Sequence, residues 1–322
     1  MMSDQTPIPG PAEEEIVRAE IVVPAEGFPP LPRAVPVVLR QPRIWPVFLV
    51  LALSLFVQIG AVGLAAVLGV MVRAGMIESG SDLQFVFREA VDAPEYLLTT
   101  AALTMAGFAL LAGGATWIEG ERLHERLRLF RPVASPGLLI LSFIGVLSLQ
   151  LAFVAATQLK IFPESDLLEE MFSKINAMGP LGRLAAVLFI GVAPGICEEV
   201  LFRGYVQTGL SRRWGPWRGA LVTAVLFGAM HLNFLQGAFA TLLGLYLGLL
   251  TERTGSVVPA MVLHSMNNVL ATIMAIGNWE PSFGQPQIVL GAAFAVMVIT
   301  EYVVAAPLLR AGLHSVPSRS NS

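Results

Sequence analysis

The sequence has few charged residues, a single cysteine and only two lysines, and each shortage narrows the interpretation. Charged side chains make up 13% of the 322 residues and hydrophobic ones 55%, which leaves too little polar surface for a soluble protein of this size. Cys197 alone excludes an intramolecular disulfide framework and leaves the redox compartment undetermined. Only Lys160 and Lys174 among 20 basic residues are lysines, which hints at a GC-rich genome. The composition indicates a polytopic membrane protein.

The N-terminal segment lacks any apolar run before Trp45. The run that begins there is too long for the h-region of a signal peptide. Residues 1–43 are instead rich in proline, with three consecutive acidic residues at positions 13–15. Such a segment cannot bury enough apolar area to offset its chain entropy, so it is predicted to be a disordered cytoplasmic tail.

Beyond that tail, apolar segments recur at close to the ~20 residues that cross a ~30 Å hydrocarbon layer. The fifth and sixth of these segments are short, so seven spans are an alternative to eight. The sequence predicts an all-α fold, a polytopic transmembrane helix bundle of about eight spans. The segments lie at about 45–72, 96–118, 137–159, 184 onward, 219–234, 237–250, 257–276 and 288–309.

Arginines gather on alternate connections between these segments, which predicts the orientation. The arginine-rich connections are the N-terminal one, the second, the fourth, the sixth and the C-terminal one. This bias predicts an integral protein of the bacterial inner (plasma) membrane with both termini in the cytoplasm. The arginines that carry it are Arg33, Arg40, Arg43, Arg122, Arg126, Arg128, Arg131, Arg212, Arg213, Arg218, Arg253, Arg310 and Arg319.

Three ionisable residues interrupt the fourth apolar segment, in the run PGICEEVLFR. Each costs ~3 kcal/mol at bilayer depth, so such groups are usually paired and functional. Glu199 and Arg203 are four residues apart and are predicted to pair on one helix face. Glu198 is turned ~100° away and is left as the freer carboxylate. Pro194 lacks a backbone donor and is predicted to kink the helix just before them.

Two later segments carry histidines with a partner four residues away. Phe227 precedes His231 in FGAMH, and His264 precedes Asn268 in HSMNN. At ~1.5 Å per helical residue, Glu198, His231 and His264 each lie ~16–21 Å from the nearest cytoplasmic arginine of their helix. A lone buried histidine is more often a packing residue, and a Glu–Arg pair can be a structural clip. The common depth nevertheless predicts a single site.

The ordered set EExxxR, FxxxH and HxxxN resembles the CAAX-prenyl-protease and bacteriocin-processing family of intramembrane endopeptidases, also called CPBP or Abi. The resemblance implies a helical core with a conical cavity that holds the site. The resemblance covers about 183–276, a CPBP-like catalytic core. The composition sets apart the tail at 1–43, N-terminal transmembrane helices at 44–182, and the last helix with a cytoplasmic tail at 277–322. The implied catalytic residues are Glu198, His231, His264 and Asn268, supported by Glu199, Arg203 and Phe227.

The resemblance implies peptide-bond hydrolysis in a membrane-associated protein or peptide, with Glu198 and His231 activating water. His264 and Asn268 would stabilise the oxyanion, as N–H donors do. No cofactor and no nucleic acid are expected. Glu198, His231 and His264 are also a possible ligand set for one divalent metal, with zinc as the main candidate. The HExxH helix of zinc proteases is absent, which favours the metal-free mechanism.

A second class of function stays open at this point. The same fold can serve a non-catalytic immunity or partner-binding protein, and buried charges also occur in transporters with a proton relay. Every motif residue needed for catalysis is present, which argues against the first. No inverted repeat is visible, which weakens the second.

Overall fold

The computed structural model describes residues 43–74, 82–160, 166–279 and 281–314. Within those ranges the chain forms helices and connections without a β-strand, so the predicted all-α fold is confirmed. The predicted disordered tail lies outside the described residues except for Arg43. The helices are Trp45–Ala74 (α1), Leu83–Asp92 (α2), Pro94–Ile118 (α3), Leu123–Arg126 (α4), Pro136–Gln158 (α5), Asp166–Ala177 (α6), Pro180–Ala186 (α7), Val187–Val192 (the π-helix η1), Ala193–Glu199 (α8), Val200–Gln207 (the π-helix η2), Thr208–Trp214 (α9), Pro216–Ala229 (α10), Phe234–Thr254 (α11), Val258–Ile276 (α12) and Pro286–His314 (α13).

Seven helical segments in the described ranges are long and apolar enough to cross a membrane: α1, α3, α5, the continuous stretch Pro180–Trp214, α11, α12 and Pro286–Leu309 of α13. The remaining predicted span corresponds to α10, which has 14 residues and is therefore ~21 Å long. It is too short to cross a ~30 Å layer. Seven long helices and the short α10 are roughly consistent with the prediction of about eight spans and with its alternative of seven. The protein is an integral membrane protein.

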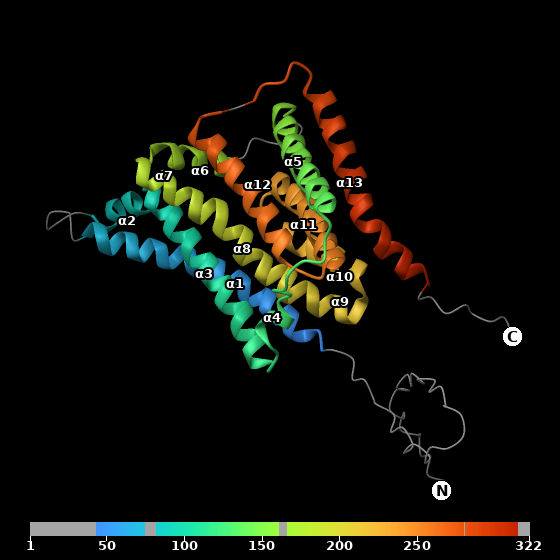
Figure 1. Ribbon diagram of the computed structural model, residues 1–322. Coiled ribbons are helices and arrows are strands. Elements are labelled where there is room, and N and C mark those ends of the chain that lie inside the picture. The colour runs from blue at the N-terminus through green and yellow to red at the C-terminus, as the bar shows by residue number, and fades with distance from the viewer. Residues whose placement is uncertain (1–42, 75–81, 161–165, 280, 315–322) are drawn as a thin grey trace, which may run out of the picture. The chain divides into compact units, whose positions relative to one another are not determined.

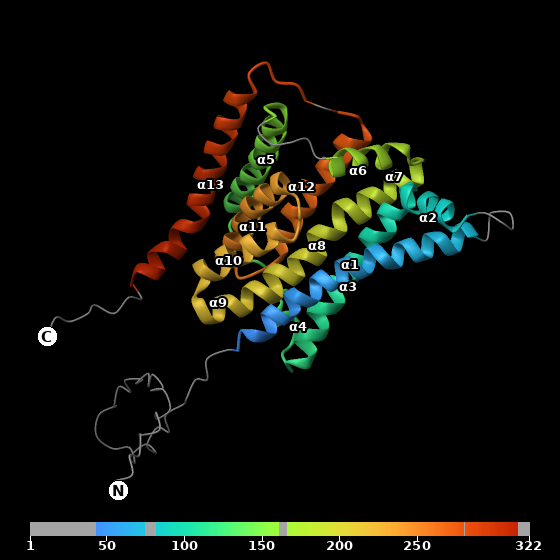
Figure 2. The ribbon, with the colours of Figure 1, turned by 180° about the vertical axis from the view of Figure 1, so that it is seen from behind.

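The stretch from α7 to α9 is one long rod, and the other helices pack along it (Figure 1). On one side, α1 and α3 pair with each other and contact η2. On the other side lie α12, which contacts η1 and α8, and then α5, α11 and α13. The view from behind gives the same order (Figure 2). Side chains on opposite faces of the middle of the rod therefore meet different groups of helices.

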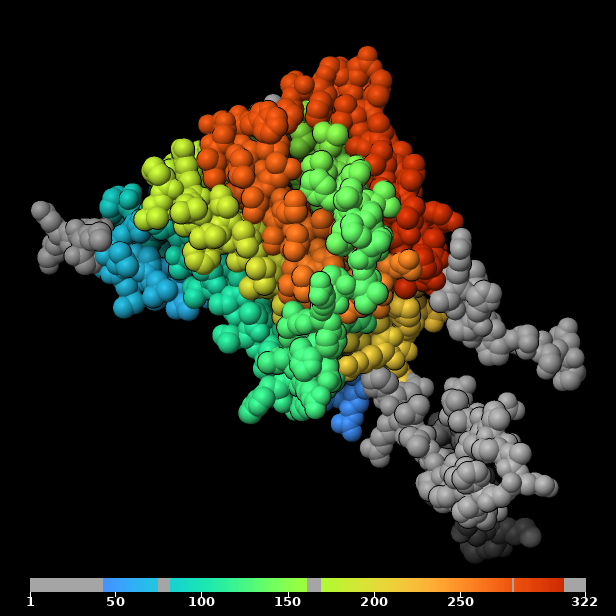
Figure 3. Space-filling model, in the orientation of Figure 1, coloured from blue at the N-terminus to red at the C-terminus, as the bar shows by residue number. Residues whose placement is uncertain are grey.

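The helices beyond the rod form two close pairs, α5 with α13 and α10 with α11. On the face shown in Figure 3, α12 lies between α7 and α5. The short helix α6 contacts α3, α7 and α12 and so lies across one end of the bundle. This arrangement encloses space between α5, α6, α8, α11 and α12.

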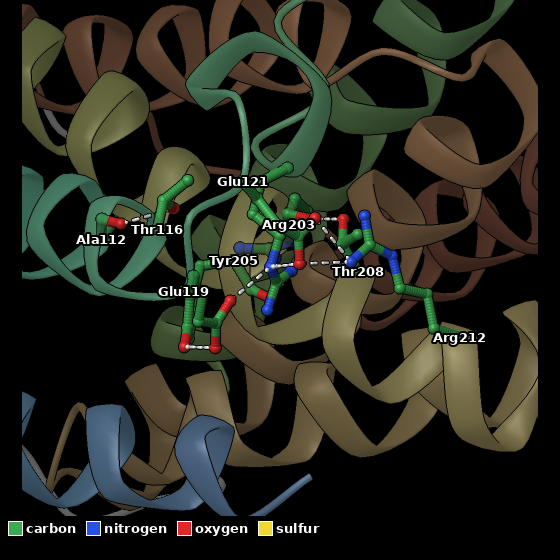
Figure 4. A network of polar contacts seen from close by, with 9 residues as sticks. Ala112, Thr116, Glu119, Glu121, Arg203, Tyr205, Thr208 and Arg212 are labelled. Carbon is green, nitrogen blue, oxygen red and sulfur yellow. Dashed lines mark hydrogen bonds and ion pairs between the residues drawn. The ribbon is translucent and has the colours of Figure 1, made fainter. Parts of the chain in front are cut away.

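Polar side chains tie the α3–α4 connection to η2 (Figure 4). The Arg126 side chain, only 3% exposed, donates from Nε to Glu119 Oε2 at 3.1 Å and from Nη1 to the Tyr205 carbonyl at 2.8 Å. Its guanidinium lies over the Tyr205 ring, and the Tyr205 hydroxyl donates to Glu119 Oε1 at 2.5 Å. Arg212 donates to Glu121 at 2.7 Å. These contacts hold the rod in place at one end.

Candidate active site

Glycines bring the rod unusually close to α12. A Cβ built on Gly195 would collide with the backbone nitrogen and hydroxyl of Ser265, and one on Gly191 would lie 2.8 Å from Val269 Cγ2. The Ser265 hydroxyl donates to the Val192 carbonyl at 3.1 Å, which links the two backbones. Small residues commonly allow such close approach in membranes. The contact sets the distance between the acidic pair on α8 and the histidine on α12.

The helical geometry is irregular on both sides of the acidic pair. The π-helix η1 precedes Pro194 and the π-helix η2 follows Glu199. Pro194 lies in the first turn of α8, which continues directly from η1, so its missing N–H removes one donor from a continuous helix. The predicted kink at Pro194 stays a prediction, and the structure has a π-helix directly before α8, a feature frequent at functional sites.

Glu199 is fully buried and binds two cationic or donor groups with one oxygen. Arg203 Nη1 donates to Glu199 Oε1 at 2.8 Å, which confirms the predicted pair. His264 Nδ1 lies 2.8 Å from the same oxygen. Because a carboxylate only accepts hydrogen bonds, Nδ1 carries the proton. The other ring nitrogen, Nε2, lies 3.9 Å from Glu198 Oε2.

His231 lies just beyond α10, not on it, because the helix ends at Ala229 and the chain turns at Leu232 with a φ of 53°. The predicted pairing with Phe227 still occurs. His231 Nδ1 is 3.1 Å from the Phe227 carbonyl, which also accepts from the Met230 N–H at 3.3 Å. Since a carbonyl accepts, Nδ1 donates, and a neutral His231 ring has its lone pair on Nε2.

The Phe227 ring is the common neighbour of the site. Its centroid is 5.1 Å from the His231 ring and 5.8 Å from the His264 ring, both edge to face. The Arg203 guanidinium carbon lies 4.4 Å from the same centroid, and Phe202 packs against it at 5.0 Å. Such contacts restrict the orientation of both imidazoles.

A cavity of about 330 Å³, called here the first cavity, brings the four predicted catalytic residues together. Glu198, His231, His264 and Asn268 all line it, with Phe227. Their catalytic role stays a prediction. The rest of the wall is largely apolar and comes from α5, α6, η1, α11 and α12. It includes Leu149, Phe153, Met171, Phe172, Ile175, Ile190, Phe239 and Leu243.

Several polar lining residues of the first cavity were not predicted. Asn267 lies beside Asn268 and donates from Nδ2 to its Oδ1 at 3.2 Å, so the Asn268 amide nitrogen is the atom available to donate elsewhere. Gln150, Gln236 and Thr272 also line the wall. An amide inside an apolar segment is itself a signal of function. That signal was present in the sequence at Gln150.

The alternative zinc set of Glu198, His231 and His264 stays a prediction. In the part of the chain that the structure describes, no three His, Cys, Asp or Glu side chains are grouped as a metal site. The separation of 3.9 Å between His264 Nε2 and Glu198 Oε2 exceeds the roughly 3.3 Å between two ligands of a tetrahedral zinc. His264 Nδ1 is bonded to the Glu199 carboxylate, which leaves Nε2 as the ring nitrogen available to a ligand, an arrangement that is also common at metal sites.

Residues 180–270 match the family model described as Type II CAAX prenyl endopeptidase Rce1-like. The predicted resemblance is confirmed. The Rce1-like segment runs from α7 into α12 and contains all seven residues of the three motifs. At the level of the family, this match supports a CAAX-type intramembrane peptidase. No curated protein and no solved structure is significantly similar to the chain.

Proposed function

We propose that this protein is an intramembrane endopeptidase that hydrolyses a peptide bond of a membrane-associated protein or peptide. The observation that carries the proposal is the convergence of Glu198, His231, His264 and Asn268 on one cavity inside the bundle. These residues come from three separate parts of the fold, namely α8, the α10–α11 turn and α12, yet all four line the same cavity. The Rce1-like match over the same residues supports it.

In the proposed mechanism, Glu198 and His231 act on water. One of them takes a proton from the water as its oxygen attacks the scissile carbonyl carbon. The His231 Nε2 lone pair and the Glu198 carboxylate are the two available bases. The new C–O bond gives a tetrahedral oxyanion. When the C–N bond breaks, the same proton passes to the leaving amine, so that water is divided between the two products.

His264 and Asn268 are proposed to hold the oxyanion. Asn268 can donate from its amide nitrogen. His264 already gives Nδ1–H to Glu199, so it can donate to an oxyanion only as an imidazolium, from Nε2. With an imidazolium, the four charges of Glu198, Glu199, Arg203 and His264 cancel. Glu199 and Arg203 are therefore positioning residues that act through His264.

The proposal is tested by comparing the protein termini of membrane fractions by mass spectrometry. Strains carry the wild type, Glu198→Gln, or Glu125→Gln as a matched change of an exposed carboxylate. Specific new termini are expected in the wild type and in Glu125→Gln, and should be absent in Glu198→Gln, His231→Ala and His264→Ala. Identical termini in all strains, at equal protein levels, would contradict a peptidase and favour a non-catalytic role.

A further inference from the structure

A second cavity of about 240 Å³ lies on the other side of the rod. Its walls come from α1, α3, η2 and α10. Glu198, Phe227 and His231 line both cavities, whereas His264 and Asn268 line only the first. The two proposed bases thus stand between the cavities, and the two proposed oxyanion donors face one of them.

The wall of the second cavity combines apolar side chains (Val62, Phe108, Phe202, Phe227 and Met230) with polar side chains from apolar helices. Gln58 comes from the middle of α1, and Thr100 and Thr104 come from one face of α3. The Thr100 hydroxyl oxygen is buried and has no hydrogen-bond partner among the described residues. By contrast, Thr99 and Thr116 of the same helix donate to carbonyls four residues back, both at 2.8 Å.

These features fit water as the occupant. A buried hydroxyl without a partner costs ~1–3 kcal/mol, and in a membrane no bulk solvent relieves that cost. Ordered water needs two to four polar partners, which Gln58, Thr104, Glu198 and His231 supply from the cavity wall. The Thr100 oxygen has less than 1 Å² of accessible surface and joins them when its side chain rotates toward the cavity. At roughly 30 Å³ per molecule, about eight waters fill the volume.

We propose that the second cavity holds and delivers the water that is consumed in hydrolysis, while the substrate occupies the first. This inference rests on the proposed function. The geometry assigns each reactant a side: the carbonyl oxygen of the substrate lies with His264 and Asn268, and water approaches Glu198 and His231 from α1 and α3. Gln58, Thr100 and Thr104 are positioning residues for that water.

The first experiment measures hydration without using catalysis. Cys197 is the only cysteine, so Cys197→Ala gives a thiol-free background. Thr100→Cys, Thr104→Cys and Gln58→Cys are compared with Ala106→Cys and Ile59→Cys, which lie on exposed faces of the same helices. Only a hydrated thiol forms the thiolate that a small methanethiosulfonate modifies. Modification at positions 58, 100 and 104 should be at least tenfold faster than at 59 and 106. Equal rates overturn the proposal.

The second experiment uses a peptide cleaved by the purified protein. Thr100→Val with Thr104→Val keeps the side-chain shape and removes both hydroxyls, and should lower kcat about tenfold with less than a twofold change in KM. Thr99→Val, whose hydroxyl is bonded within its helix, is the control and should leave both unchanged. Thr100→Ser with Thr104→Ser should restore kcat. A change confined to KM, or no change in kcat, overturns the proposal.

The two proposals fail in distinguishable ways. If Glu198→Gln abolishes cleavage but the cysteines at 58, 100 and 104 react no faster than the controls, the water route is wrong and the peptidase stands. If the membrane-protein termini are identical in the wild-type and Glu198→Gln strains at equal protein levels, the peptidase is wrong, whatever the thiols report.

Discussion

At the scale of single residues, two adjacent glutamates differ because their surroundings differ. The Glu198 side chain is 15% exposed and lines both cavities, whereas Glu199 is fully buried against Arg203 and His264. A buried ion pair adds little net stability, but removing one partner leaves a charge uncompensated. Glu198 is therefore placed to act on a substrate, and Glu199 is placed to hold His264 and Arg203 in position.

Substitution to glutamine should separate these roles. Glu198→Gln should lower activity by roughly two to four orders of magnitude, the range of a lost general base, at unchanged abundance and melting temperature. Glu199→Gln leaves Arg203 unpaired and should cost about 3 kcal/mol. It should also lower activity, because His264 loses its carboxylate partner. Turnover and thermal unfolding in nanodiscs measure both effects.

The double variant Glu199→Gln with Arg203→Met is the control, since it removes both charges. Stability should largely return while activity stays low. A Glu199→Gln protein that is fully stable but inactive, beside an unstable Glu198→Gln protein, would show that the assignment is reversed.

Metal dependence is a second question at this scale, and the loose spacing of Glu198 and His264 motivates it. Protein treated with a strong chelator should keep its activity, and elemental analysis should find no stoichiometric zinc. Activity that disappears on chelation and returns with one metal per chain would instead support the Glu198, His231 and His264 ligand set.

At the scale of elements, the contact between α8 and α12 sets the site. Helical spacing alone predicted the Glu199–Arg203 pair, since both residues lie on one helix. It could not predict that Glu199 also binds His264, because that contact depends on how closely two helices approach. The approach is set by Gly191 and Gly195. The sequence predicted that Glu198, His231 and His264 lie at one depth. The hydrogen bond between Glu199 and His264 could be seen only once the packing of the two helices was known.

Gly195→Ala tests that packing. The added methyl group would fall on the Ser265 backbone, so α8 and α12 must separate, at a cost of about 1–3 kcal/mol. Activity should fall more than tenfold as Glu198 moves from His264. Gly113→Ala, at a helical glycine of α3 with open space around it, is the control and should be neutral or slightly stabilising. Thermal unfolding and turnover are measured for both, and unchanged activity in Gly195→Ala would contradict this role.

The end of α10 is another feature that the sequence did not reveal. The apolar run continues through Leu232 and Phe234, so hydropathy predicted a span of 219–234. The helix stops at Ala229 because the chain reverses there, with the His231 ring bonded to the Phe227 carbonyl. Hydropathy depends only on the residue types, so it could not predict a helix end that is fixed by a hydrogen bond.

The connection around α4 gives a further prediction. Arg126→Gln breaks a buried set of contacts with Glu119 and Tyr205 and should cost about 2 kcal/mol. Arg122→Gln, whose side chain is 76% exposed and pairs with Glu125, should cost less than about 0.5 kcal/mol. Differential scanning calorimetry in the same detergent compares them. Equal losses would show that the Arg126 contacts do not hold the rod.

At the scale of the whole molecule, the distribution of arginines predicts that both termini lie in the cytoplasm. A reporter that fluoresces only in the cytoplasm should be active when fused after Arg131, Arg213 or Arg310. It should be dark after Asp92 or Pro281, which lie at the opposite ends of the spans. The reverse result at any two of these positions would overturn the proposal that both termini are cytoplasmic.

The short α10 has a consequence for the surrounding lipid. Leu232 of the α10–α11 turn and Phe234 at the start of α11 are both more than three-quarters exposed. Acyl chains must bend or thin to meet this turn, a hydrophobic mismatch of roughly 9 Å against a 30 Å layer. His231 is part of that turn. If α10 ends within the hydrocarbon layer, a change in bilayer thickness is expected to move the turn that holds His231, and turnover in nanodiscs of short-chain and long-chain lipids measures that effect.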